Sequence, residues 1–438
     1  SHLQKTDLTM EEELFLNSWI SFFRTTSNVG NEVLVEVIEH KPVASLDNNR
    51  YLTQGGWIIE PEKENKTLSL IQLIGKDRKL NHLLDVASSI QIVKMCEAFS
   101  ELKNQVTLIT TNSSSGNIFN FYNIKTKFKF RKIKYFKKFP LGIKFYLFSI
   151  LSILEGMKFK PDIYITRNFF TCFLLTLLKK KTILELHHDL NSESRIIRFI
   201  IKKYDFLNSK YLTKLIAITN SVKNYYIKNH SIKSNKIIVL PSGSSIKENF
   251  KKNINKKKLN IGYFGSLYKS RGLDLIIKLA MIDPKNNYYI YGSKKQTKVS
   301  FSKKIKKNLF LNDHVPYKKI SKILMNMDLL LMPYTSSITV AGDVGDITKY
   351  TSPLKLFDYL SVGRPIMCSN FNVLKEIISE NKNAIFVKNY KNVVAWKNEI
   401  TKLNNKPEMM KIISKNNYKL SKKYSHNVRA SKILDILK

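Results

Sequence analysis

The stretch "TSPLKLFDYLSVGRPIMCS", residues 351–369, has the pattern of a helix followed by a buried strand. Ser352 is a good N-cap residue and Pro353 suits the first helical position, which predicts a helix that ends near Gly363. Lys355 then occupies the third helical position, where a cation opposes the helix dipole at a cost of roughly a few tenths of a kcal/mol. A bound anion at this helix start would reverse that cost.

Asp358 follows Lys355 by three residues and is therefore predicted to share its face of the helix. A carboxylate about one turn from a phosphate site is well placed to bind ribose hydroxyls. An ordinary surface pair between the lysine and the aspartate explains the same spacing without a ligand, so both interpretations stay open at this point.

The chain has 438 residues, 43% of them hydrophobic, which predicts two or more domains with ordinary buried cores. Its three cysteines, Cys96, Cys172 and Cys368, lie far apart in the sequence and exclude a disulfide framework or a cysteine-based zinc site. The net charge is +40 at pH 7. This charge fits nucleic acid, an anionic membrane surface or an anionic ligand, and a lysine-rich genome bias would produce it equally well.

Residues 1–75 differ from the rest of the chain in charge, with 6 Lys and Arg against 11 Asp and Glu, a net charge of −5. This break in composition predicts a separate acidic N-terminal α+β extension. The segment 8–23 has the pattern of an amphipathic helix, whereas 32–40, 50–60 and 66–75 have the pattern of strands.

From residue 76 the sequence alternates between strand and helix patterns, which is typical of a parallel sheet. We predict a Rossmann-like domain over 76–245, a second one over 246–420 that starts with a lysine-rich linker, and a C-terminal helix over 421–438 that returns to the first domain. Two such doubly wound domains that face each other leave a cleft between their strand-end loops, where ligands of these sheets bind. The predicted fold class is therefore α/β, preceded by the small α+β extension.

The stretch "YFGSLYKSRGLDLII", residues 263–277, places a glycine-containing turn between a buried strand and a helix. The backbone at Gly265 and Ser266 can approach a ligand closely, and the start of the helix offers unpaired N–H groups to an anion. Lys269 and Arg271 would add positive charge, and arginine can grip a diphosphate through two donors. An ordinary strand-to-helix turn with solvated basic residues is the alternative.

Polar residues also end strands of the first predicted domain. "LELHHDL" places His187, His188 and Asp189 at one strand end, where a histidine can donate a hydrogen bond to a phosphate or a sugar hydroxyl, or can serve a structural role. Adjacent residues point to opposite sides of a strand and no third ligand lies nearby in the sequence, so we predict no metal site. "VLPSGSS", residues 239–245, is either a plain interdomain turn or a loop that contacts a ligand.

Two apolar runs, residues 141–154 and 169–178, fall short of the roughly 20 residues that a membrane-spanning helix needs. The first fits either a helix that rests on an anionic membrane surface or a plain core helix. We expect a cytoplasmic protein, with peripheral attachment to the inner face of the cell membrane as an open alternative.

In this order, the motifs resemble those of the family 4 glycosyltransferases, which have the GT-B fold. The resemblance covers roughly residues 80–438 and is carried by "GYFGSLYKSRGLDLII", "KILMNMDLLLMPY" and "SPLKLFDYLSVGRPIMCSNFNVLKEII". It implies transfer of a hexose-type sugar from a nucleotide diphosphate sugar, a UDP- or GDP-sugar, with retention of the anomeric configuration, no metal and no tightly bound cofactor. The implied partner is a glycan or lipid-linked acceptor in bacterial surface polysaccharide synthesis.

The resemblance also implies roles for single residues. Arg271 corresponds to the basic residue that binds the donor diphosphate, Asp358 to the acid that holds the donor ribose, and His187 to the histidine near the reacting sugar, with His188 in reserve. Ser266 stands where many members have Arg, and Lys355 supplies that charge instead. The implied catalytic residues are His187, Arg271 and Lys355, and the implied donor-binding residues are Gly265, Ser266, Lys269, Arg271, Ser352, Lys355 and Asp358.

The chain departs from the family pattern at two further places. Tyr350 stands where many members have a Glu that contacts the donor sugar, and "DVASSIQ", residues 85–91, replaces a glycine-rich loop after the first strand. These departures suggest an inactive GT-B scaffold or partner subunit as one alternative. A sugar-nucleotide epimerase of the same fold and a basic nucleic-acid-binding protein are two further alternatives. Nucleic acid is disfavoured because the 21 Tyr and 25 Phe mostly fall within strand and helix patterns.

Overall fold

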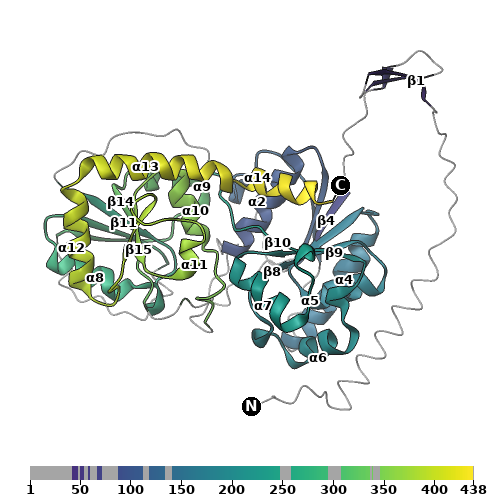
Figure 1. Ribbon diagram of the computed structural model, residues 1–438, viewed down its shortest axis with the longest axis horizontal. Coiled ribbons are helices and arrows are strands. Elements are labelled where there is room, and N and C mark those ends of the chain that lie inside the picture. The colour runs from purple at the N-terminus through teal and green to yellow at the C-terminus, as the bar shows by residue number, and fades with distance from the viewer. Residues whose placement is uncertain are drawn as a thin grey trace.

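The structure is a computed structural model, and it describes residues 42–47, 50–53, 58–59, 67–71, 87–111, 118–133, 141–246, 258–293, 307–335, 338 and 346–437. Two α/β domains lie side by side, and the C-terminal helices pass from one to the other (Figure 1). The helix predicted over 8–23, the strand predicted over 32–40 and most of the linker lie outside the described residues.

A small antiparallel sheet of three strands, in the order β1-β2-β3, precedes the two domains in the sequence. Two of its strands fall within the predicted strand segment 50–60, which is thereby confirmed. The strands are β1 (Pro42–Asp47), β2 (Arg50–Thr53) and β3 (Ile58–Ile59).

The first domain is built on a parallel sheet in the order β10-β9-β8-β7-β4-β5-β6. Its central strand β4 comes from the segment that composition assigns to the acidic extension, so the boundary predicted between residues 75 and 76 is wrong. Strand β4 contains no charged residue, so a change in charge could not mark where this domain begins. The strands are β4 (Thr67–Ile71), β5 (Gln105–Thr111), β6 (Lys129–Ile133), β7 (Ile163–Thr166), β8 (Thr182–Leu186), β9 (Leu212–Ala217) and β10 (Ile237–Val239).

Helices cover both faces of this sheet, because alternate strand residues point to opposite sides. Tyr164 belongs to the core under α4 to α7, whereas its neighbours Ile163 and Ile165 belong to the core under α2. The helices are α2 (Ala87–Glu101), α3 (Ile118–Phe121), α4 (Leu141–Met157), α5 (Phe169–Leu177), α6 (Arg195–Tyr204) and α7 (Asn220–His230), with 3-10 turns η1 (Leu190–Ser192), η2 (Phe206–Asn208) and η3 (Ser234–Lys236).

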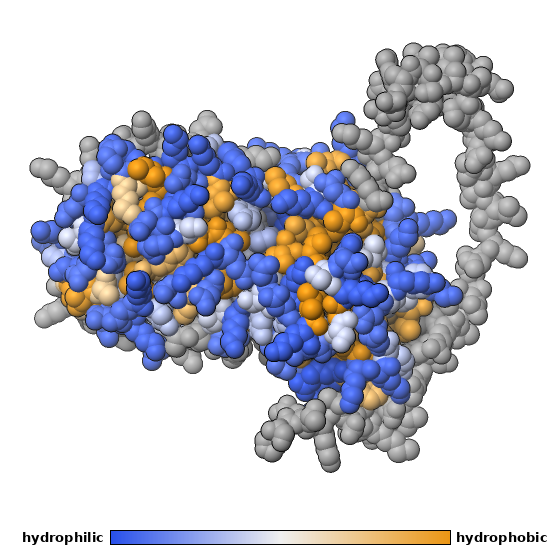
Figure 2. Space-filling view, viewed as in Figure 1, coloured by the Kyte–Doolittle hydropathy of each residue, from blue (hydrophilic) through white to orange (hydrophobic). Residues whose placement is uncertain are grey.

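The two apolar runs form α4 and α5. In α5, every residue from Phe169 to Thr176 is buried. In α4, the buried side chains of Tyr146, Phe148, Ile150 and Ile153 belong to the same core. Among the described side chains of this helix, the exposed apolar ones are Ile143, Leu154 and Met157, with 39%, 37% and 36% of their surface accessible. Figure 2 shows hydrophobic patches that are interrupted by hydrophilic side chains on the visible face. In the described part of the chain, no helix is long and apolar enough to cross a membrane.

The second domain has a parallel sheet in the order β13-β12-β11-β14-β15-β16, which confirms the predicted second α/β unit. Its strands are β11 (Asn260–Phe264), β12 (Asn287–Tyr291), β13 (Leu309–Asn312), β14 (Leu329–Met332), β15 (Ile366–Ser369) and β16 (Ala384–Val387). Its helices are α8 (Leu273–Ile282), α9 (Tyr317–Leu324), α10 (Leu354–Ser361), α11 (Asn372–Lys375), α12 (Val393–Asn404) and α13 (Pro407–Ser421), with the 3-10 turn η4 (Lys269–Arg271).

In both sheets the first strand of the domain, β4 or β11, lies between the second and the fourth, so the winding direction reverses beside it. Ligands of such sheets bind at the carboxyl ends of the strands at this reversal. The fold therefore predicts ligand-binding positions at the turn after β11 and at the carboxyl ends of β7 and β8.

The chain returns to the first domain at its C-terminus. The 3-10 turn η6 (Lys422–Tyr424) follows α13, and Ser425 pairs with Ser244 where the chain first crosses between the domains. Helix α14 (His426–Asp435) then packs against α2 through the buried side chains Ala430 and Ile433 (Figure 1).

This packing predicts that Ile433→Ala lowers the free energy of unfolding by about 2–4 kcal/mol, because it leaves a cavity under α14. The control is Ile412→Ala on α13, where the side chain is 57% exposed and the expected change is within about 0.5 kcal/mol. Urea unfolding followed by circular dichroism measures both. Equal effects of the two substitutions would contradict the docking of α14.

Candidate active site

The turn after β11 brings the backbone close to a lysine of α10. Gly265 has a φ of +142°, and its N–H donates to the Tyr291 carbonyl over 3.0 Å. A Cβ atom added to Gly265 would lie 2.7 Å from Nζ of Lys355. The absence of a side chain at residue 265 therefore makes room for the ammonium group. The structure brings these two predicted site residues together.

Two tyrosine rings hold the cations of this site. Nζ of Lys355 lies 4.3 Å from the ring centroid of Tyr263 and 5.7 Å from that of Tyr334. Cζ of Arg271 lies 5.4 Å from the Tyr334 centroid. Both cations thus approach the ring of Tyr334, where the electron-rich face attracts positive charge. We call Tyr263, Gly265, Arg271, Tyr334 and Lys355 the cation cluster.

The electrostatics of the cation cluster favour an anion. Burial, together with the nearby guanidinium of Arg271, holds the pKa of Lys355 well below its usual value. No acidic side chain among the described residues raises the pKa of Lys355 back toward its usual value. An anion between the two cations would stabilise the protonated lysine and accept its hydrogen bonds, so the cluster has the charge and the donors of a phosphate site.

The start of α10 differs from the predicted one. The helix begins at Leu354, with Pro353 in the N-cap position and no side-chain cap bond. Ser352 Oγ instead accepts a hydrogen bond from the Ser242 N–H, and the Ser352 carbonyl accepts one from Ser242 Oγ, both over 3.0 Å. The prediction of Ser352 as N-cap is therefore wrong, because its side chain joins the two domains. Lys355 is the second rather than the third helical residue, still within the first turn.

Asp358 lies inside the protein rather than on a surface. It is 5% exposed, and its Oδ1 accepts hydrogen bonds from Ser244 Oγ over 2.6 Å and from the Tyr317 hydroxyl over 3.3 Å. Burial raises the pKa of Asp358 to about 7. The alternative of a surface pair with Lys355 is therefore wrong, because the carboxylate binds the segment that crosses between the domains. Its ribose contact stays a prediction.

The other two residues predicted in the β11 turn take different positions. The Ser266 carbonyl accepts a hydrogen bond from the Tyr263 hydroxyl over 2.7 Å, so Ser266 lies beside the cation cluster. Lys269 is exposed in η4, and within the described part of the chain it makes none of the ring contacts that hold Arg271 and Lys355.

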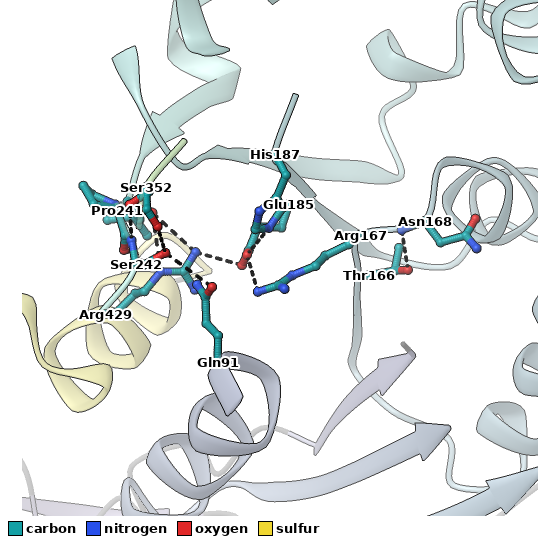
Figure 3. Close-up of polar contacts among 11 residues, drawn as sticks. Gln91, Thr166, Arg167, Asn168, Glu185, His187, Pro241, Ser242, Ser352 and Arg429 are labelled. Atoms are coloured by element: carbon teal, nitrogen blue, oxygen red, sulfur yellow. Dashed lines mark hydrogen bonds and ion pairs between the residues drawn. The ribbon is translucent and has the colours of Figure 1, made fainter. Parts of the chain in front are cut away.

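His187 belongs to a charged network at the carboxyl ends of β7 and β8 (Figure 3). Glu185 is buried; its Oε1 lies 2.6 Å from His187 Nε2 and 2.7 Å from an Arg167 nitrogen, and its Oε2 lies 2.8 Å from Arg429 of α14. Burial alone would raise the pKa of Glu185, but Arg167 and Arg429 hold it well below its usual value. The network therefore contains an ionised carboxylate shared by two arginines.

Burial and the charge of Arg167 lower the pKa of His187 to about 4. The ring is therefore neutral at neutral pH. Because Glu185 is ionised, we assign the ring proton to Nε2, which donates to Glu185 and leaves Nδ1 as the acceptor nitrogen.

His188 points away from this network, as expected for adjacent strand-end residues. Its Nε2 lies 3.5 Å from Glu193 Oε1, and its Nδ1 lies 2.7 Å from the Asp189 carbonyl. In the part of the chain that the structure describes, no group of three His, Cys, Asp or Glu side chains could hold a metal ion.

A cleft of about 580 Å³ lies between the domains, which we call the interdomain cleft. Its lining residues are Ser221, Asn224, Tyr225 and Lys228 of α7, and Thr348, Lys349, Tyr350, Asn370, Phe371, Asn372 and Val373 of the second domain. The Tyr350 hydroxyl hydrogen-bonds Asp189 across the cleft. Phe371 stacks on Tyr334, with ring centroids 6.3 Å apart, so the cleft adjoins the cation cluster.

Further contacts hold the domains together beside the interdomain cleft. Thr219 Oγ1 donates to the Tyr350 carbonyl over 3.4 Å. The Asn220 N–H at the start of α7 donates to Glu376 Oε2 over 2.8 Å. Ser242, which bonds Ser352 of the second domain, is held on the first-domain side by Gln91, whose Oε1 lies 3.3 Å from Ser242 Oγ (Figure 3).

Four residues that shape the site escaped the sequence analysis: Tyr334, Arg167, Glu185 and Arg429. Tyr334 follows β14 and Arg167 follows β7, so their positions at strand ends could have indicated them. Glu185 sits inside an apolar strand pattern, and Arg429 lies 244 residues away from it in a C-terminal helix. No local pattern predicts that contact.

The cation cluster predicts that Lys355→Met raises the free energy of unfolding at pH 6, relative to the unmodified protein. The folded protein holds the pKa of Lys355 below the 10.5 of an ordinary lysine. At a pH below this lowered pKa, the protonated lysine therefore reduces the free energy of unfolding. This reduction disappears as the pH rises toward 10.5, so the stabilisation by Lys355→Met should be smaller at pH 9.5 than at pH 6. Thermal unfolding at pH 6 and pH 9.5 measures the effect.

Lys269→Met is the matched control, because this lysine is exposed and lies in the same loop. We expect little change from it at either pH. A loss of stability in Lys355→Met at pH 6, relative to this control, would contradict the account of the cation cluster.

Comparison with known proteins agrees with the geometry. A sequence model described as glycosyl transferases group 1 matches residues 244–420, and one described as glycosyltransferase family 4 matches residues 89–247. No curated protein matches the sequence.

Solved structures share the fold at low sequence identity. Sucrose-phosphate synthase from Thermosynechococcus elongatus is 12% identical, with a TM-score of 0.63 over 85% of this chain and 98% of that one. A glycosyltransferase from Rickettsia africae is 15% identical, with a TM-score of 0.62 over 86% and 99% of the two chains. Anabaena HepE, solved with UDP and glucose, is 9% identical, with a TM-score of 0.60 over 85% and 99%. The sequence models and the shared fold together identify this chain as a family 4-like glycosyltransferase with the GT-B fold.

Proposed function

We propose that this glycosyltransferase moves a sugar from a nucleotide diphosphate sugar to a glycan or lipid-linked acceptor in bacterial surface polysaccharide synthesis. The observation that carries the donor assignment is the cation cluster, in which Arg271 and Lys355 meet on Tyr334 beside the glycine turn of β11. HepE, which shares the fold, was solved with UDP and glucose, and this supports a UDP-sugar as the donor.

In the proposed reaction, the bond between C1 of the sugar and the diphosphate oxygen breaks, and its electron pair stays with the departing diphosphate. The oxygen of an acceptor hydroxyl forms the new bond to C1, and the hydroxyl proton passes to the departing diphosphate. Arg271 and Lys355 are placed to neutralise the negative charge that develops there, and so to lower the barrier. These two side chains supply positive charge that a divalent metal supplies elsewhere. We therefore propose a metal-independent transfer, with retention as the family resemblance implies.

His187 would act from the opposite domain. As a neutral ring with Nδ1 as acceptor, it can receive a hydrogen bond from a sugar hydroxyl. Glu185 orients the ring through Nε2, so the acceptor nitrogen keeps one direction. Asp358 remains our candidate for the ribose contact through Oδ2, because Ser244 and Tyr317 both bind Oδ1.

An anionic membrane surface is a further proposed partner, as expected for a lipid-linked acceptor. The net charge of +40 supports it, as do the exposed basic residues Arg195, Lys202 and Lys203 on the amphipathic helix α6. Helix α4 contributes Ile143, Leu154 and Met157, because its other described apolar side chains are buried or partly buried.

An inactive GT-B scaffold stays the alternative, because Tyr350 replaces an acid of the family pattern and binds Asp189. The two proposals differ in one observable: an active enzyme releases nucleoside diphosphate from its donor, and a scaffold does not.

A panel of UDP-, GDP- and ADP-sugars, with release of nucleoside diphosphate as the readout, tests the proposal. Arg271→Ala should lower turnover of the preferred nucleotide sugar roughly 100-fold or more, because the negative charge that develops on the diphosphate loses a cationic hydrogen-bond partner. Arg271→Lys should retain part of the activity, since it keeps the charge but loses the two-pronged grip.

Lys278→Ala on α8 is the control, because this lysine is exposed. Its turnover should match that of the unmodified protein, and no variant should melt below the unmodified protein, so that a loss of turnover does not reflect a loss of folding. Full activity in Arg271→Ala, or no release from any donor by the unmodified protein, would overturn the proposed function.

A further inference from the structure

Arg429 reaches the candidate active site from the C-terminal end of the chain (Figure 3). It is the fourth residue of α14, and its Nη2 lies 2.8 Å from Glu185 Oε2. Its Nε donates to the Pro241 carbonyl over 3.0 Å, just before the chain crosses to the second domain. The guanidinium is therefore held in one direction, and the proposed reaction assigns no role to it.

The Glu185 carboxylate divides its two oxygens between different partners. Oε1 lies 2.6 Å from His187 Nε2 and 2.7 Å from an Arg167 nitrogen, whereas Oε2 faces Arg429. Glu185 and Arg429 are only 5% and 4% exposed, so water screens the attraction between them weakly. Without Arg429, Oε2 would lose a cation in a buried place, where a proton would take over the neutralising charge.

One proton bound by Glu185 and His187 together would change the ring in the same way at either site. On Glu185, the carboxyl hydroxyl would donate to Nε2, and the proton of the ring would move to Nδ1. On His187, the imidazolium would carry a proton on both nitrogens. In each case Nδ1 becomes a donor, so Nδ1 is an acceptor only while this pair of side chains holds no extra proton.

The position of Arg429 opposes that extra proton. Its charge lowers the pKa of both Glu185 and His187, and Arg167 acts in the same direction. Arg167 is the more exposed of the two arginines, with 12% of its side chain accessible, and it shares Oε1 with the ring. Arg429 is the buried cation on the other oxygen.

Other titratable groups around this network are neutral or paired. Burial and the charge of Arg429 lower the pKa of His426 to about 3, so this ring is neutral, and its Nδ1 bonds Ser245 Oγ over 2.8 Å. Further titratable side chains are paired with each other, namely Lys94 with Glu97 on α2 and His188 with Glu193 after β8. In the described part of the chain, Arg167 and Arg429 are therefore the cations that keep Glu185 ionised.

We propose that Arg429 is a positioning residue for the transfer reaction, because it keeps Glu185 as the hydrogen-bond acceptor of His187 and so leaves Nδ1 to accept from a substrate hydroxyl. This inference rests on the role proposed for His187 and adds a requirement for α14. The docked C-terminal helix would thus complete the active site as well as stabilise the fold.

Nitrogen NMR of the full, ligand-free chain with 15N-labelled histidine tests this assignment, with His187→Gln to identify the signals. In the unmodified protein we expect a neutral ring with its proton on Nε2 between pH 6 and pH 8. In Arg429→Met, a proton should appear on Nδ1 at a pH that is roughly one unit or more higher than in the unmodified protein.

Three further variants separate this role from simple docking of α14. Arg429→Lys keeps the charge and should largely restore the ring of the unmodified protein. Lys432→Met removes an exposed cation from the same helix, and Ile433→Ala weakens docking without a change in charge. Both should leave the His187 signals unchanged, and circular dichroism shows whether each variant is folded.

The pH dependence of nucleoside diphosphate release links the ring to turnover. In Arg429→Met, kcat should fall on the acidic side, and the acidic limb of its pH profile should move to higher pH with the NMR transition. Lys432→Met and Ile433→Ala should keep the limb of the unmodified protein.

A proton on Nδ1 of the unmodified protein at pH 7 would overturn the inference even if Arg429→Met fails to fold. Unchanged NMR signals in folded Arg429→Met, or an equal shift in Ile433→Ala, would also overturn it. The NMR measurement needs no substrate, so its failure is distinct from that of the proposed function. The expected ring in a chain that releases no nucleoside diphosphate would overturn the proposed function, and the role of Arg429 in transfer with it.

Discussion

The repulsion between Arg271 and Lys355, which meet on the buried ring of Tyr334, is the constraint on which the proposed donor site depends. Burial of Lys355 and this repulsion together hold the pKa of the lysine well below its usual value. A bound diphosphate would convert the repulsion into two attractive contacts. The site also depends on Gly265, because a side chain at this position would displace the ammonium group of Lys355.

Helix α10 connects this site to the junction between the domains. At its start, Lys355 faces the cation cluster, and one turn later Asp358 holds Ser244 in the crossing segment. On the other side of the junction, Glu185 holds both His187 and Arg429 of the returning helix α14. The groups proposed to act on the sugar are thus anchored by the same contacts that fix the two domains relative to each other.

Much of this could be predicted from sequence where a local pattern carries the information. The alternating strands and helices predicted both α/β domains. A glycine after a buried strand and a lysine at a helix start were each predicted as parts of an anion site, and the structure brings Gly265 and Lys355 together. The start of the first domain was misplaced because β4 is uncharged. Asp358 and Ser352 took other partners, and Tyr334 and Arg429 were missed, because contacts between segments far apart in the sequence decide all four.

Burial and the neighbouring Arg271 disfavour the protonated form of Lys355, and the donor diphosphate would favour it. Calorimetric titration of UDP at pH 8.5, in two buffers that differ in ionisation enthalpy, counts the protons taken up on binding. We predict proton uptake by the unmodified protein and none by Lys355→Met, because diphosphate raises the depressed pKa of the lysine. UDP binding without proton uptake, or with the same uptake in both proteins, would contradict the account.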